Sequence, residues 1–69
     1  MKKVTLNRVC IEKKVQESGR TVCYATPVFE STDMTLAMMV ATSCKKFHER
    51  VIIQGYSVDG SDYYGVVEV

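Results

Sequence analysis

The sequence predicts an α+β fold in which one helix packs on a roughly four-stranded antiparallel sheet, in the order β-hairpin, helix, β-hairpin (ββαββ). Residues 33–50 show the apolar spacing of a helix and contain neither Gly nor Pro. The segments on both sides alternate apolar and polar residues, as strands do. Each segment is divided by a turn signal, Ser18-Gly19 in the first and Asp59-Gly60 in the second. We expect residues 1–69 to form a single small domain.

The helix is expected to begin after three good N-cap residues, Ser31, Thr32 and Asp33, whose side-chain oxygens can accept hydrogen bonds from first-turn amides. Basic residues near residue 50 suit the negative end of the helix dipole. Apolar residues three and four positions apart predict the side of the helix that faces the sheet. These residues are Ala37, Val40, Ala41, Cys44, Phe47 and Val51.

The first half of this helix carries more apolar side chains than one sheet can cover. Met34, Leu36, Met38 and Met39 surround the core-facing residues, so the segment is apolar on nearly every side. A helix of this kind is normally buried on more than one side. Two interpretations remain open: the methionines fill irregular gaps in the core, or Met34, Met38 and Met39 belong to a surface that binds a partner.

The first hairpin is predicted from residues 4–17 and 20–29, joined by a two-residue loop. This register places Val15 opposite Val22. The apolar residues of the first strand change face near residues 7–8, which indicates a bulge or a twist there. On the second strand, simple alternation predicts one face with Val22, Tyr24, Thr26 and Val28, and the other with Cys23, Ala25 and Phe29.

The second hairpin, residues 51–58 and 63–69, is apolar on both faces, whereas a half-solvated sheet alternates cleanly. A two-residue turn at Asp59-Gly60 predicts the pairs Tyr56–Tyr63, Ile52–Val67 and Ile53–Val66. The apolar excess predicts a homodimer or a protein partner, bound through a sheet face or the last edge strand. Tyrosine is enriched at interfaces, so the candidate contacts include Tyr56, Tyr63 and Tyr64. A plain cross-strand aromatic pair is the alternative.

Composition narrows the classes of function. The formal net charge is +1, from nine basic and eight acidic residues, which argues against strong electrostatic binding to nucleic acid or membranes. No apolar run reaches the roughly 20 residues of a membrane span, so we expect no membrane association. The three cysteines are an odd number, and no apolar segment of signal-peptide length begins the chain. We therefore expect a cytoplasmic protein with free thiols.

No motif predicts catalysis, a metal site or a cofactor. Cys44 and His48 are four residues apart and could form half of a metal or nucleophile site, but nearby sequence offers neither further ligands nor an orienting acid. Residues 59–62 lack the spacing of a calcium loop and are explained by turn chemistry. Because so short a chain rarely builds a closed active site, we expect a non-enzymatic protein without a cofactor.

Two further functions remain open. The first is a nucleic-acid-binding module, in which basic residues act together with exposed tyrosines. Its candidate residues are Lys13, Lys14, Lys45, Lys46 and Arg50, which solvated surface would also explain. The second is a carrier that holds a small ligand in an apolar pocket at a dimer interface.

The function that we expect first is a protein-binding module, homodimeric and acting by stoichiometric contact. In size and layout the chain is similar to the small α+β inhibitors and adaptors encoded by phages and mobile elements, including inhibitors of bacterial defence systems. This similarity implies an inhibitor that acts by covering a surface of a host protein.

Overall fold

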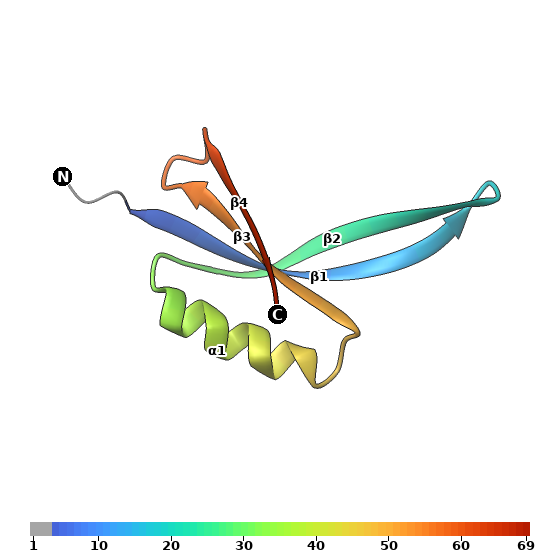
Figure 1. Cartoon of the computed structure of the whole chain (residues 1–69), viewed down its shortest axis with the longest axis horizontal. Helices are drawn as coiled ribbons and strands as arrows, with labels where there is room; N and C mark the ends of the chain where they lie inside the picture. Colours follow the sequence, from blue (N-terminus) through green and yellow to red (C-terminus); the bar gives the residue numbers. More distant parts are fainter. Residues whose placement is uncertain (1–3) are drawn as a thin grey trace.

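The computed structural model describes residues 4–69 and shows two hairpins and one helix in the expected order (Figure 1). The strands form one antiparallel sheet with the helix on one face, so the predicted α+β fold is confirmed. The sheet order is β2-β1-β3-β4, which makes β2 and β4 the edge strands. The elements are β1 (Thr5–Glu17), β2 (Arg20–Ser31), α1 (Met34–Lys45), β3 (Arg50–Ser57) and β4 (Tyr63–Glu68).

The first hairpin turns where the sequence predicts. Val15 lies opposite Val22, and the loop residues Ser18 and Gly19 both have positive φ, 49° and 76°, as a type I′ turn requires. β1 pairs with β3 only from Thr5 to Glu12. Within residues 4–69, the hairpin residues 13–24 therefore have no third strand beside them. This part of the hairpin, which we call the arm, projects past α1 and lengthens the molecule to 48 Å (Figure 1).

A bulge in β2 changes which residues face the helix. The register of β1 with β2 shifts between Val9 and Cys10, because Val28 has no partner. Phe29 therefore lies opposite Val9, on the same face as Thr26, and packs against the core. The prediction that Phe29 and Thr26 lie on opposite faces is wrong, because one unpaired residue reverses the alternation of those that follow. The bulge predicted in the first strand near residues 7–8 is therefore found in β2, opposite the step from Val9 to Cys10, while β1 pairs with β3 without a register shift.

Asp33 caps the N-terminus of α1, as the sequence predicts. Its carboxylate accepts hydrogen bonds from the amides of Thr35 and Leu36 at 2.9 and 3.3 Å, and its own amide donates to the Ser31 hydroxyl at 3.0 Å. These bonds satisfy donors that have no partner inside the helix. They also fix the point at which the chain leaves β2 and enters α1.

The C-terminal end of α1 differs from the prediction, because the helix ends at Lys45 and not at residue 50. Phe47 is consequently in the connecting turn with 83% of its surface exposed, so its predicted place in the core is wrong. The chain has to reverse before Arg50, which begins β3 opposite Glu12 of β1. This long-range pairing outweighs the helix propensity of the intervening residues.

The second hairpin keeps the predicted Tyr56–Tyr63 pair, but the pairs beyond it are shifted by one position. A bulge at Tyr64 inserts one extra residue of β4 between the Tyr56–Tyr63 and Gly55–Gly65 pairs, and this extra residue displaces the register. The observed pairs are Gly55–Gly65, Gln54–Val66, Ile53–Val67 and Ile52–Glu68. The predicted pairs Ile52–Val67 and Ile53–Val66 are therefore wrong.

The turn of this hairpin is longer than the two residues that the sequence predicts. The amide of Ser57 donates to the carbonyl of Asp62 at 2.9 Å, so residues 58–61 form the loop. The Asp59 carboxylate accepts from the Ser57 hydroxyl at 2.6 Å and from the amide and hydroxyl of Ser61 at 3.0 and 2.7 Å. These bonds, chiefly the one from Ser57, lower the pKa of Asp59 to about 2.

The core lies between α1 and the two central strands. Val9 of β1 and Val51 and Ile53 of β3 meet Ala37 and Ala41 of α1, and all five are almost completely buried. The short alanine side chains allow the helix to approach the sheet closely. Four half-buried side chains complete this cluster: Phe29, Val40, Cys44 and Val69.

Candidate protein-binding surfaces

The helix covers only part of the sheet face on which it lies. Within residues 4–69, α1 packs against β1, β2 and β3 but not against β4. A helix with its side chains is about 10 Å wide and neighbouring strands are about 4.8 Å apart, so one helix fully covers about two strands. The helix side of β4 consequently stays exposed, although its residues are as apolar as those of β3.

An apolar groove runs between α1 and β4. We call it the α1–β4 groove and define it by Met34 of α1 and by Tyr64 and Val67 of β4. Met34 also borders a neighbouring hollow on α1, which Met38 and Met39 line. All five side chains are more than one third exposed. Gly55 lies beneath the groove, and because it has no side chain the space beside Tyr64 stays open. Large apolar side chains around a hollow are typical of a contact surface.

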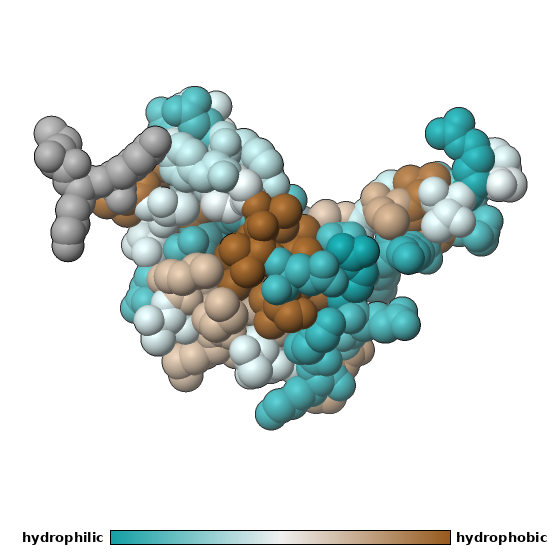
Figure 2. All heavy atoms as spheres, viewed as in Figure 1, coloured by the Kyte–Doolittle hydropathy of each residue, from teal (hydrophilic) through white to brown (hydrophobic). Residues whose placement is uncertain are grey.

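The space-filling view shows this apolar surface directly (Figure 2). Strongly hydrophobic residues gather at the centre of the visible face, where β4 runs in Figure 1, and paler apolar residues of α1 lie next to them. Val66 and Val67 of β4 are each about half exposed, and Met34 and Met38 are somewhat less so. The apolar excess of the helix and that of the last strand therefore meet in one region.

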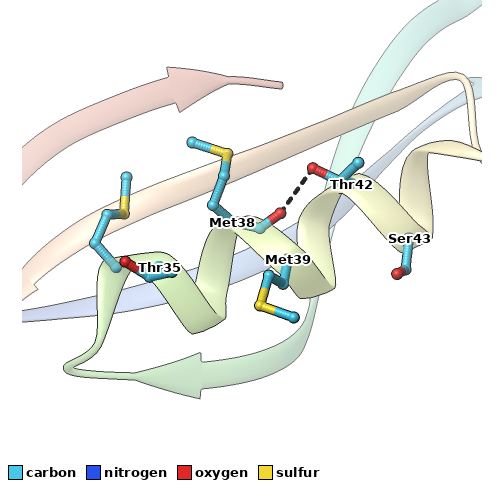
Figure 3. A pocket seen from close by; sticks show the side chains of 6 residues that line it. Thr35, Met38, Met39, Thr42 and Ser43 are labelled. Atoms are coloured by element: carbon cyan, nitrogen blue, oxygen red, sulfur yellow. Dashed lines mark hydrogen bonds between the residues drawn. The ribbon is translucent and has the colours of Figure 1, made fainter.

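A second apolar surface lies elsewhere on α1. Met38 and Met39 are consecutive residues and so lie about 100° apart around α1. Met38 points towards the side on which β3 and β4 run (Figure 3). Met39 is 63% exposed and lies with Leu36 and Phe47 along a shallow apolar surface. We call these three residues, Leu36, Met39 and Phe47, the helix ridge. The ridge and the α1–β4 groove use different sides of one helix.

The tyrosines of the second hairpin are divided between the two faces of the sheet. Tyr56 and Tyr63 form a ring pair with centroids 5.2 Å apart on the face without the helix. The Arg8 guanidinium lies 4.6 Å from the Tyr56 ring centroid, and the Tyr56 hydroxyl donates to Gln54 at 3.3 Å. These contacts make Tyr56 and Tyr63 a cross-strand aromatic pair, whereas Tyr64 lies at the α1–β4 groove.

The six residues proposed for partner binding thus do not form one surface. Met34 and Tyr64 come together at the groove, and Met38 lines the neighbouring hollow on α1 with Met34 and Met39. Met39 also belongs to the helix ridge, and the ring pair lies on the opposite face of the sheet. Sequence reasoning missed Val67, Phe47 and Gly55 as members of these surfaces. An isolated Gly inside a strand is a signal of open space or close approach, and it could have indicated Gly55.

The basic residues proposed for nucleic acid are also only partly together. Lys13, Lys14 and Arg50 line a hollow between the arm and the end of α1, together with Phe47 and His48. Glu12 and Glu49 line the same hollow, and the Arg50 guanidinium lies 3.7 Å from Glu12 and 3.5 Å from Glu68. The Lys45 ammonium donates to the backbone carbonyl of Glu49 at 2.6 Å, and Lys46 caps the end of α1.

The three cysteines are free thiols in different environments. Cys10 is buried and its thiol donates to Gln54 at 3.4 Å, and burial raises its pKa although Arg8 opposes the shift. Cys23 is exposed on the arm and Cys44 is half-buried. The expected alignment of Cys44 and His48 on one helix does not form, because α1 ends before His48. Residues 4–69 contain no cluster of three His, Cys, Asp or Glu side chains able to hold a metal ion.

Comparison with known proteins gives no relative, since no family model, no curated protein and no solved structure matches this chain. No helix in the described part of the chain is long and apolar enough to cross a membrane.

Proposed function

We propose that this chain is a non-enzymatic protein-binding module that acts by stoichiometric contact through the helix ridge. The observation that carries the proposal is the exposure of Met39 and Phe47, at 63% and 83%. They lie with Leu36 on one surface, which no other element among residues 4–69 covers. Full burial of a side chain of this size contributes about 1.5–3 kcal/mol. A partner that buries the ridge would therefore gain a useful part of its binding energy from these three residues.

The ridge suits one common mode of recognition, in which a helix lays apolar residues into a hydrophobic groove on a folded protein. Leu36 and Met39 are three residues apart and share one side of α1. Phe47 extends this surface past the end of the helix. Methionine adapts its shape to an irregular partner surface. The expected partner is a folded protein with an apolar groove of matching length.

An inhibitor or an adaptor acts in this way, by occupying a surface on another protein. The small size and the ββαββ layout support the narrower proposal that the target is a host protein and that the chain is encoded by a phage or mobile element.

The test compares three proteins as bait: the unchanged chain, Met39→Lys, and Val58→Lys as a control in the loop between β3 and β4. Val58 is also an exposed apolar residue, but it lies in a different part of the molecule and does not line the surface that contains the ridge. We expect a protein that co-purifies with the unchanged chain and with Val58→Lys at a fixed molar ratio, and whose affinity falls at least about tenfold with Met39→Lys. Equal binding to Met39→Lys, or no protein recovered at a fixed ratio, would contradict the proposal.

Nucleic-acid binding is the second candidate, because the structure brings Lys13, Lys14 and Arg50 to one hollow beside the exposed Phe47 ring. Cations around an aromatic ring suit a single strand with stacked bases. Glu12 and Glu49 in the same hollow reduce the positive charge, which places this candidate second. Binding to single-stranded DNA that weakens steeply with salt, and is lost in Lys13→Glu, would support it. Absence of binding at low salt would exclude it.

A further inference from the structure

Within residues 4–69, no strand pairs with the outer edge of β4, which leaves its outward backbone groups open to another strand. The amide of Val69 donates to the carbonyl of Val51 at 2.9 Å, and in an antiparallel ladder such bonded pairs recur at every second residue. The next bonded pair is therefore Ile53–Val67. It follows that the N–H and C=O groups of Val66 and Glu68 point away from β3, towards the open edge of the sheet.

This edge lacks the features that normally prevent strand addition. Edge strands are protected by Pro, by Lys, by bulges or by charges that point inwards. The other edge strand, β2, has Pro27 and the bulge at Val28. β4 has a single charged residue, Glu68, and neither Pro nor Lys. Its bulge at Tyr64 lies near its start and Gly65 has a positive φ of 133°, so the regular stretch begins at Val66 and has Val67 near its centre.

We propose that a second copy of this chain adds to β4 as an antiparallel strand, about a two-fold axis that passes close to Val67. In this register the outward N–H and C=O groups of Val66 in each copy form hydrogen bonds with those of Glu68 in the other copy. The two sheets then become one continuous sheet with both helices on the same face. The contact goes beyond the proposed function, because the β4 residues that form it do not belong to the helix ridge.

A second copy accounts for more of the exposed surface than a single extended peptide would. Val67 packs against its equivalent across the axis, because directly opposed side chains in a sheet lie close together. The two α1–β4 grooves meet on the helix side of the joined sheet, and Met34 and Met38 of each copy approach those of the other. An extended peptide would satisfy the backbone groups but bring no second helix to cover these methionines.

The charges on the edge permit the same arrangement. Glu68 of each copy is diagonal to Glu68 of the other, at about 7–8 Å. Each carboxylate already has the guanidinium of its own Arg50 at 3.5 Å, so the two acidic groups do not meet uncompensated. One short edge and a few methionines make a small interface, below about 1,200 Å² in total, and we therefore expect a dimer that dissociates on dilution.

Cysteine cross-linking tests both the partner and the register. Val67→Cys, in a Cys23→Ser background, places two thiols opposite each other with Cα atoms about 4.5 Å apart, within the range of a disulfide. We expect mild oxidation to give a covalent dimer. The matched control, Val28→Cys in the same background, carries a similarly exposed residue on the other edge strand and should stay monomeric.

Amide hydrogen exchange of the unchanged chain provides a second readout that needs no variant. Exchange at Val66 and Glu68 should slow at least severalfold as the concentration rises, while exchange at Val67, already bonded to β3, should change less. The proposal would be overturned if folded Val67→Cys did not cross-link, or if Val28→Cys cross-linked equally. It would also be overturned if the exchange rate at Val66 did not change with protein concentration. Met39→Lys should dimerise normally, so failure of the ridge and failure of the β4 contact are distinguishable.

Discussion

β3 and β4 are neighbours in one hairpin, yet apolar residues on the same face of these two strands differ greatly in burial. Ile53 of β3 is 2% exposed, while Val67, directly opposite on β4 and on the same face, is 49% exposed. Both are β-branched apolar residues of the kind that favours strands. The helix causes this difference in burial, because α1 lies over β3 and does not reach β4.

This contrast shows that burial in a small α+β domain depends on the width of its covering layer as well as on strand sequence. Ala37 and Ala41 bring α1 close to β1 and β3, and one helix is too narrow to cover a further strand fully. The fourth strand completes the sheet but lies outside this cover. Its apolar residues are then available for contacts between molecules.

The largest expected effect is the difference in stability loss when each residue of the opposed pair Ile53–Val67 is truncated to alanine. Ile53→Ala should lower the free energy of unfolding by about 2–5 kcal/mol, because it leaves a cavity beneath α1. Val67→Ala removes a half-exposed side chain and should cost less than about 1 kcal/mol at protein concentrations where the chain is monomeric. Urea unfolding of both variants at high dilution measures the difference. Similar losses for the two variants would show that α1 does not set the contrast.

A smaller loss of stability is expected when the N-terminal cap that holds the first turn of α1 is removed. Asp33→Ala removes the acceptor for the amides of Thr35 and Leu36 and should cost about 1 kcal/mol of stability. Asp33→Asn keeps an acceptor and should lose clearly less. Chemical denaturation gives both values, and faster amide exchange in the first turn of α1 would localise the change. An unchanged Asp33→Ala variant would contradict the role given to this cap.

The smallest effect concerns the turn that joins β3 to β4. Hydrogen bonds from Ser57 and Ser61 lower the pKa of Asp59 from 3.8 to about 2, so the unfolded chain takes up this proton first as the pH falls. The stabilisation from Asp59 should be complete above about pH 4 and disappear as the pH falls towards about 2. Thermal unfolding of the unchanged chain and Asp59→Ala should therefore differ slightly at pH 5 and converge near pH 2. A constant difference across this range would disagree with the lowered pKa.

Local sequence signals predicted the parts of the fold that short-range chemistry controls. The Ser18-Gly19 turn fixed the register of the first hairpin, and the side-chain oxygen of Asp33 marked the start of α1. The Tyr56–Tyr63 pair near the second turn was also predictable. In each case the decisive groups lie within a few residues of the feature.

Features that depend on distant contacts could not be predicted in this way. The end of α1 at Lys45 is set by the pairing of β3 with β1, and the exposure of Phe47 follows from it. Pro27 and Gly65 stand beside the bulges at Val28 and Tyr64 and mark irregular strands, but they do not indicate at which residue the register shifts. For the candidate surfaces, the methionine excess was visible in the sequence. Its division into groove and ridge required the position of α1 on the sheet.

The most direct test of the uncovered β4 surface is the solution mass measured by light scattering over a wide range of protein concentration. We expect the solution mass of the unchanged chain to rise from 7.8 kDa towards twice that value as the concentration increases. Val67→Lys should stay at the monomer mass, and Val28→Lys, on the other edge strand, should follow the unchanged chain. A constant monomer mass for the unchanged chain, or equal self-association of Val67→Lys, would contradict the claim that the strand left uncovered by α1 binds a second copy.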